Sequence, residues 1–200
     1  DSAVKKYERK FNGRKTSQLR VSEKEIKEAR SKISRGKWHG LEVMSSILHY
    51  EESMFLQGFS NPKNWKGKLA KTSFVSIPSV GCYIPGGQAR YPSSVVMSVK
   101  PAKIAGVKRI VVVSPPGRDG KIDPLTIAAA KRCGATEIYK VGGAQAIGAL
   151  AYGTKSIPKV DKIVGPGGKF VSIAKSLVSN QTSIDMVAGP TELGIIANAS

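Results

Sequence analysis

The sequence has 200 residues, 40% of them hydrophobic, which is enough to bury the core of one or two domains. Its net charge of +18 is spread evenly, since residues 1–80 hold 17 basic and 8 acidic side chains and residues 81–200 hold 15 and 6. Nucleic-acid binders usually concentrate basic residues on one face, so this pattern argues against that class. No apolar run approaches the roughly 20 residues of a membrane span, and the first residues lack an apolar signal region. We therefore expect a soluble, cytoplasmic protein.

The N-terminal part of the chain (1–79) is predicted to be a helical segment that ends in a linker. Apolar residues recur at helical spacing over residues 4–11 and 38–57. The sequence S-E-K-E at 22–25 is typical of a capping box, which begins a further helix. Residues 61–79 contain two prolines and a glycine with few periodic apolar side chains, so we expect a linker between lobes.

From residue 80 onward, short β-branched runs alternate with helical patterns. Strands are predicted at 81–84, 109–114, 137–141, 162–164 and 193–197, and helices at 93–105, 123–133, 144–152 and 170–178. Pro101 should kink or split the first of these helices, and Gly134 should end the second. This alternation predicts an α/β fold with a doubly wound parallel sheet.

Glycine-rich turns follow the predicted strands, at the sheet edge where ligands of such folds bind. Glycine lets the backbone approach a ligand closely, and a helix N-terminus favours anions such as pyrophosphate. Strict nucleotide motifs are absent, because Phe170 stands at the third glycine position after Gly165, and no Ser or Thr follows Lys169. Glycine in these turns also has a purely steric explanation, so the spacing leaves nucleotide binding open. Gln145 could bond a ligand or merely cap its own helix.

The candidate metal ligands and thiols lack any partner at ligand spacing. His39 and His49 have no carboxylate or second histidine four residues on, so we interpret them as surface or core histidines. Cys82 and Cys133 are too few for a disulfide framework and are predicted to be packed thiols.

Four segments together resemble successive motifs of the histidinol dehydrogenase family, in the same order, over about residues 11–197. They are G-C-Y-I-P-G-G at 81–87, V-G-G-A-Q-A-I-G-A-L-A-Y-G at 141–153, P-K-V-D-K-I-V-G-P-G at 158–167 and I-D-M-V-A-G-P-T-E at 184–192. The resemblance implies the N-terminal part of an NAD-dependent, zinc-containing, homodimeric enzyme. Such an enzyme oxidises L-histidinol through L-histidinal to L-histidine, the last step of histidine biosynthesis.

The resemblance also implies roles for individual residues. Tyr83 and Gln145 match cofactor-binding residues of the family, and Gly168 stands where the family has a third cofactor contact, an asparagine. Any contact from Gly168 must therefore come from the backbone, and cofactor binding could be weaker. Thr191 matches a serine that binds substrate, and it keeps the hydroxyl.

Other family features fall outside the matched segments. The family's catalytic Glu-His pair and its zinc ligands lie downstream of the last motif, so we expect no catalytic residue and no metal site in this chain. The isolated chain should be inactive. The resemblance further implies an incomplete Rossmann-like sheet, with 1–79 as part of a discontinuous first domain, 80–192 as the cofactor-side domain and 193–200 as the start of a return strand.

Two interpretations of other classes remain open at this stage. The chain could be a non-catalytic basic α/β module that binds phosphate or nucleic acid. It could also be a degenerate remnant kept for subunit assembly, for which Gly168 would be evidence of decay.

Overall fold

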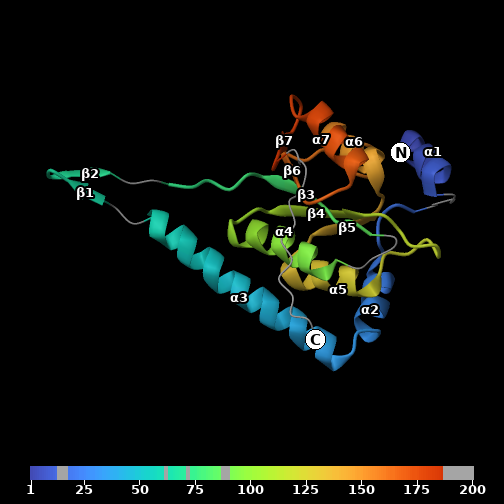
Figure 1. The fold of residues 1–200 in the computed structure, drawn as a ribbon, viewed down its shortest axis with the longest axis horizontal. Helices are drawn as coiled ribbons and strands as arrows, with labels where there is room; N and C mark the ends of the chain where they lie inside the picture. The colour runs from blue at the N-terminus through green and yellow to red at the C-terminus, as the bar shows by residue number, and fades with distance from the viewer. Residues whose placement is uncertain (13–17, 61–62, 71–72, 87–90, 187–200) are drawn as a thin grey trace, which may run out of the picture.

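The computed structural model describes residues 1–12, 18–60, 63–70, 73–86 and 91–186. Its centre is a five-stranded, all-parallel sheet in the order β5-β4-β3-β6-β7 (Figure 1). The strands are β3 (Ser79–Tyr83), β4 (Arg109–Ser114), β5 (Glu137–Lys140), β6 (Lys162–Val164) and β7 (Ser183–Ile184). The predicted doubly wound α/β sheet is confirmed. The strand β7 was not predicted, and the strand predicted at 193–197 lies outside the described residues.

Helices cover both faces of this sheet. One face carries α4 (Pro92–Ile104) and α5 (Pro124–Cys133), and the other carries α6 (Gly143–Tyr152) and α7 (Lys169–Val178), as Figure 1 shows. A hydrophobic core lies on each face of the sheet, and β4 contributes side chains to both cores, because successive side chains of a strand point to opposite faces. Ile110 and Val112 belong to the core on the α4 and α5 side, whereas Val111 and Val113 belong to the core on the α6 and α7 side.

Both predicted helix signals hold in the structure. The helix α2 (Glu23–Ser31) begins at a complete capping box, in which the Ser22 hydroxyl accepts the Glu25 N–H and the Glu25 carboxylate accepts the Ser22 N–H. Gly134 follows α5 in the left-handed conformation, at φ 109°, which glycine adopts without steric penalty.

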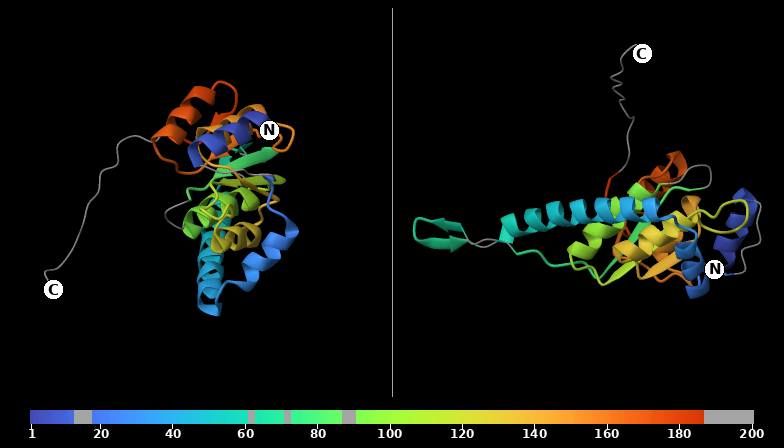
Figure 2. Two further views of the ribbon diagram at one scale, coloured as in Figure 1. Left: turned by 90° about the vertical axis from the view of Figure 1, so that its right-hand side faces the viewer. Right: turned by 90° about the horizontal axis from the view of Figure 1, so that it is seen from below.

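The first two helices pack on opposite helical layers. The helix α1 (Ser2–Asn12) lies beside α6 with Val4 buried against it, while α2 packs on α5 (Figures 1 and 2). The Asp1 carboxylate accepts hydrogen bonds from the Ser156 N–H and hydroxyl at 3.0 and 2.5 Å. These contacts fix α1 to the α6 side of the sheet.

The helix α3 (Arg35–Ser60) is longer than predicted and leads to an antiparallel hairpin of β1 (Lys63–Trp65) and β2 (Lys68–Ala70). The helix packs against α4, and its C-terminal end and the hairpin extend away from the α/β body (Figures 1 and 2). No strand was predicted within residues 61–79, so the hairpin is an element that the periodic pattern missed. Its two-residue turn has positive φ at both positions, 48° and 72°, and Gly67 supplies the second without strain. Strands of three residues are too short to show an alternating pattern.

The helix α4 runs through Pro101 without a break, so of the two predicted effects, a kink or a split, the split does not occur. Proline has no N–H, so the carbonyl of Met97, four residues before Pro101, lacks its helical hydrogen bond. Met97 is 58% exposed. Water can reach this side of the helix, which limits the penalty.

Both cysteines are buried, unpaired thiols, as predicted. Cys82 and Cys133 are 0% and 2% exposed, and both lie in the core on the α4 and α5 side. Burial raises the pKa of the Cys82 thiol to about 12, so it remains protonated and unreactive.

Candidate functional site

The strand order places a topological switch point between β3 and β6. From β3 the chain crosses to β4 through α4, and it later reaches the other side of β3 through α6. Ligands of open α/β sheets bind in the crevice outside the carboxyl ends of strands at such a point. The carboxyl end of β3 is Tyr83, and the turn after β6 is Gly165 to Gly168. Two of the predicted cofactor residues thus lie at this edge.

Gly165 brings the two strand ends together. It has φ 111°, and a Cβ placed on it would lie 2.1 Å from the carbonyl oxygen of Tyr83. No other residue type combines this backbone conformation with so close an approach. The glycine turn after β6 therefore lies directly against the end of β3.

An ion pair between the buried Lys175 and the partly exposed Asp185 holds this turn. The Asp185 carboxylate accepts the Gly165 N–H at 2.8 Å and bonds Lys175 Nζ, which also donates to the Gly165 carbonyl at 3.1 Å. Lys175 is 4% exposed. Partial burial acts to raise the pKa of Asp185, but the hydrogen bonds from Lys175, Gly165 and Met186 outweigh it and lower the pKa. The carboxylate is therefore ionised, and both backbone groups of Gly165 are bound.

Tyr83 reaches from β3 to the turn before α6. Its hydroxyl accepts the Gly143 N–H at 3.1 Å, and the residue is 5% exposed. Burial raises the pKa of Tyr83, and the nearby Glu8 carboxylate raises it further, so the hydroxyl stays protonated. Gly142 allows the turn to pack closely, since a Cβ there would lie 2.4 Å from Pro115 Cβ.

Gln145 lies on the first turn of α6 and is bonded to the N-terminal helix. Its Nε2 donates to Glu8 Oε1 at 2.7 Å, and the same oxygen accepts the Gly142 N–H at 3.0 Å. The predicted cofactor residues Tyr83 and Gln145 are therefore both connected to the turn from Gly142 to Gly143, Tyr83 by a direct bond and Gln145 through Glu8. No sequence pattern points to Glu8, because it lies in a short amphipathic helix 134 positions away from that turn.

Gly168 is the N-cap residue of α7 and makes no side-chain cap. A Cβ placed on it would meet no atom within 4 Å, so the position has room for a larger residue. The structure does not place Gly168 in contact with Tyr83 or Gln145. The predicted substrate residue, Thr191, lies outside the described residues.

A groove of about 870 Å³ lies on the other face of the sheet from Tyr83 and Gln145. Its walls are mainly apolar side chains of α3, α4 and residues 74–77, and it reaches the turn after β6, with Lys175 and Asp185 in its lining. Neither Tyr83 nor Gln145 lines it.

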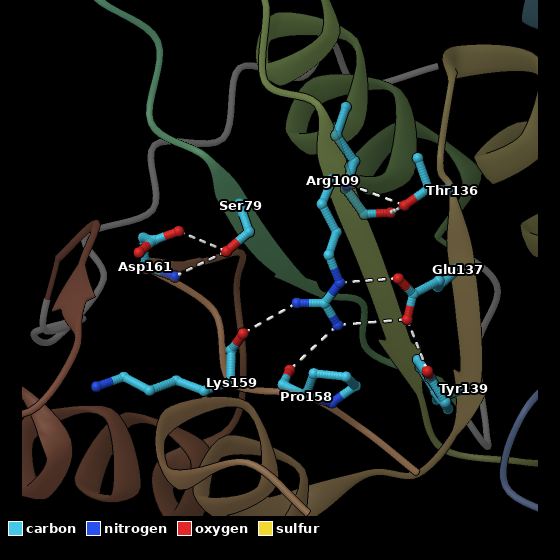
Figure 3. Close-up of polar contacts among 9 residues, drawn as sticks. Ser79, Arg109, Thr136, Glu137, Tyr139, Pro158, Lys159 and Asp161 are labelled. Atoms are coloured by element: carbon cyan, nitrogen blue, oxygen red, sulfur yellow. Dashed lines mark hydrogen bonds and ion pairs between the residues drawn. The ribbon is translucent and has the colours of Figure 1, made fainter.

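Residues at the opposite edge of the sheet form a second polar network (Figure 3). Arg109 binds both carboxylate oxygens of Glu137, at 2.8 and 3.3 Å, and donates to the carbonyls of Pro158 and Lys159. Partial burial acts to raise the pKa of Glu137, but Arg109 and Tyr139 outweigh it and lower the pKa. Burial, followed by the adjacent Glu137, raises the pKa of Tyr139 to about 12. This network connects the amino ends of β4 and β5 to the segment before β6.

Within the described residues, no three His, Cys, Asp or Glu side chains are grouped as metal ligands. His39 and His49 are exposed on α3, in agreement with the interpretation as surface histidines. A zinc site therefore does not fit the part of the chain that the structure covers.

Comparison with known proteins decides the family. The histidinol dehydrogenase family model matches residues 1–200. The chain belongs to the histidinol dehydrogenase family. Curated histidinol dehydrogenases of Bacillus licheniformis, Bacillus anthracis and Methanococcus maripaludis are 45%, 48% and 47% identical to it. These alignments cover 99 to 100% of the chain and 46 to 47% of each relative.

A solved histidinol dehydrogenase, that of Elizabethkingia anophelis, has the same fold over the matched part. It is 35% identical, with a TM-score of 0.88, over 96% of this chain and 44% of that one. The chain thus spans about half the length of the histidinol dehydrogenases it matches. The resemblance seen in the sequence is confirmed, and the comparisons give no support to a nucleic-acid module or an assembly remnant.

Among the described residues, no helix combines the length and apolar character that crossing a membrane requires. The longest helix, α3, carries charged residues along its length and contains 26 residues.

Proposed function

We propose that the protein catalyses the NAD-dependent oxidation of L-histidinol through L-histidinal to L-histidine, in the cytoplasm. The supporting observation is that Tyr83 and Gln145, two residues at cofactor positions implied by the resemblance, both lie at one turn at the carboxyl edge of the sheet. Tyr83 bonds this turn directly, and Gln145 is joined to it through Glu8. The family match over residues 1–200 supports comparing these positions with the cofactor-binding residues of the family. NAD, when bound, supplies the acceptor for hydride.

The chain's own residues would bind and orient this cofactor. Tyr83 fixes the Gly142 to Gly143 turn by accepting an amide hydrogen, and the half-buried Gln145 presents its amide at the same turn. Gly168 would contribute only backbone groups from the start of α7. The hydroxyl of Thr191 would bind L-histidinol, as the corresponding serine does in the family.

We place the remaining chemistry outside the described residues. The resemblance places the zinc ligands and the Glu-His pair downstream of the last motif, in the part of the relatives that this chain does not match. The described residues contain no group of metal ligands, which is compatible with this proposal. We also propose a homodimer, as in the family, and a first domain that is completed by a return strand after residue 192.

The decisive experiment follows NADH formation from L-histidinol by the full-length protein. Gln145→Ala should raise the KM for NAD about tenfold, the effect of losing one well-placed hydrogen bond of about 1.4 kcal/mol. Gln57→Ala is a matched control, because Gln57 is exposed on α3. Absence of NADH formation would reject the proposed activity, and an unchanged KM in Gln145→Ala would reject the proposed site.

A polypeptide of residues 1–200 alone should bind nucleotide weakly and should not oxidise L-histidinol. The measurement is turnover in chelator-treated buffer, with the full-length protein as the positive control. Turnover by the shorter polypeptide would show that catalytic groups lie within residues 1–200.

A further inference from the structure

Glu8 is a fully buried carboxylate in the N-terminal helix, at 0% exposure. It lies at the amino end of α6, where its Oε1 accepts the Gly142 N–H and one N–H of Gln145. The helix α1 is held to this place by Val4 in the core and by Asp1 on Ser156. Figure 1 shows α1 lying alongside α6.

This contact determines how the Gln145 amide is oriented. Its nitrogen points to Glu8, and its oxygen lies over the turn, 2.9 Å from where a Cβ on Gly143 would be. The reverse orientation would set the amide oxygen against a carboxylate oxygen, and two acceptors repel each other. Glu8 therefore selects one of the two amide orientations.

The same contact places an anion at the amino end of α6. Unpaired N–H groups and the helix dipole favour a negative charge there, and in many α/β proteins a phosphate provides it. Here the Gly142 N–H binds Glu8 and the Gly143 N–H binds Tyr83. A phosphate at this place would meet a buried carboxylate, so the Gln145 side chain is the group of this turn suited to meet an uncharged part of the dinucleotide.

We propose that Glu8 is a positioning residue for NAD binding, which acts by holding Gln145 in the orientation that the cofactor requires. This inference rests on the proposed function, because it takes Gln145 to be a cofactor contact. Nothing in the family resemblance assigns a role to α1 or to Glu8.

The test measures KM for NAD and kcat in the full-length enzyme for Glu8→Ala, Glu8→Gln, Gln145→Ala and the Glu8→Ala/Gln145→Ala double variant. Glu8→Ala should raise KM about five- to tenfold with kcat within about twofold, because it removes two hydrogen bonds at the site but no reacting group. The KM of the double variant should be no higher than that of Gln145→Ala alone, because Glu8 is proposed to affect NAD binding only through its hydrogen bond to Gln145, which Gln145→Ala already removes.

Glu8→Gln should restore KM to within about twofold of the original value. Both bonds end on a single oxygen, and the amide oxygen of glutamine can accept two hydrogen bonds in its place. Val4→Ala is the control for docking, because it loosens α1 without changing any hydrogen bond to Gln145.

The outcomes separate the two proposals. If Gln145→Ala raises KM and Glu8→Ala does not, the positioning role is wrong and the proposed function stands. If Val4→Ala raises KM as much as Glu8→Ala, then Glu8 acts only by docking α1, and the positioning role is again wrong. If Gln145→Ala has no effect, the cofactor site itself is wrong. Should Glu8→Ala fail to fold, Glu8→Asp replaces it, and an unchanged KM in that variant would overturn the inference.

Discussion

The two edges of the parallel sheet are built differently. At the amino edge, Arg109 binds the Glu137 carboxylate and also donates to two backbone carbonyls, so the network ties neighbouring segments rigidly together (Figure 3). At the carboxyl edge, glycines let strands and turns approach, and polar side chains bond the turns. Polar groups at the first edge serve stability, whereas those at the second shape a surface that a ligand can meet.

The largest effect should come from Gly165, where the carboxyl edge is tightest. Gly165→Ala forces a Cβ to within 2.1 Å of the Tyr83 carbonyl oxygen at a φ of 111°. We expect a loss of about 4 kcal/mol or more in the free energy of unfolding, together with loss of NAD binding. Urea denaturation and NAD titration measure the two effects.

Gly148→Ala is the matched control for this substitution. Gly148 lies inside α6, and a Cβ there meets no atom within 4 Å. Alanine is the better helix former, so stability should rise by about 0.5 to 1 kcal/mol. Equal behaviour of the two variants would mean that close approach at Gly165 is not what the site requires.

Asp185→Asn should have the next largest effect, because it leaves Lys175 charged and buried without its counter-ion. We expect a loss of about 3 kcal/mol, less than for a fully enclosed pair because the Asp185 side chain is 28% exposed. Glu42→Gln is the control, since the Glu42 and Arg132 pair spans 3.8 Å with both side chains 39% exposed, and such pairs contribute about 0 to 1 kcal/mol.

The same carboxylate gives a pH dependence with a definite sign. The pKa of Asp185 is lower in the folded state than its ordinary value of 3.8, so its contribution is fully present above that value. The contribution is lost as the pH falls through the folded-state pKa. Urea midpoints measured between neutral pH and about pH 3 should therefore converge for the native protein and Asp185→Asn. A constant difference would contradict the lowered pKa.

Arg109→Lys tests the amino edge. Lysine cannot hold both Glu137 oxygens and two carbonyls at once, because it lacks the planar fork of the guanidinium. Stability should fall by about 1 to 2 kcal/mol, while the KM for NAD stays the same. A change in KM would show that the two edges are coupled and not separate in role.

Gly168→Asn should have the smallest effect on stability. Asparagine at an N-cap gains a few tenths of a kcal/mol over glycine, and the space around Gly168 accepts it. It also supplies the amide that the resemblance implies for a cofactor contact at this position, so the KM for NAD should fall. An unchanged KM, with the expected gain in thermal stability, would remove Gly168 from the cofactor site.

The sequence predicted the α/β body well because its signals are local. Strands such as 109–114 and 162–164 match the structure residue for residue, since β-branched runs between glycine turns leave few alternatives. The hairpin at 63–70 and the continuous helix through Pro101 were missed, because a two-residue turn and the solvent on one side of a helix are not visible in a periodic pattern.

Some residues of the candidate site could likewise be predicted from the sequence, and others could not. Tyr83, Gln145 and Gly168 could be named because they lie in family motifs, and the glycine turns marked the edge. The contacts made by Glu8 and by the Lys175 and Asp185 pair could not, because each depends on how a helix packs against another helix or against the end of a strand. No local pattern carries that information.

The buried thiols have a practical consequence. Cys82 and Cys133 are the chain's two cysteines, and both lie in the core beneath α4 and α5. A thiol reagent added to the native protein can react only when the α4 and α5 layer opens. The labelling rate therefore measures the free energy of opening that layer and does not depend on opening of the α6 and α7 layer. Labelling in the presence and absence of NAD would then show whether ligand binding on the α6 side raises the free energy of opening the α4 and α5 layer.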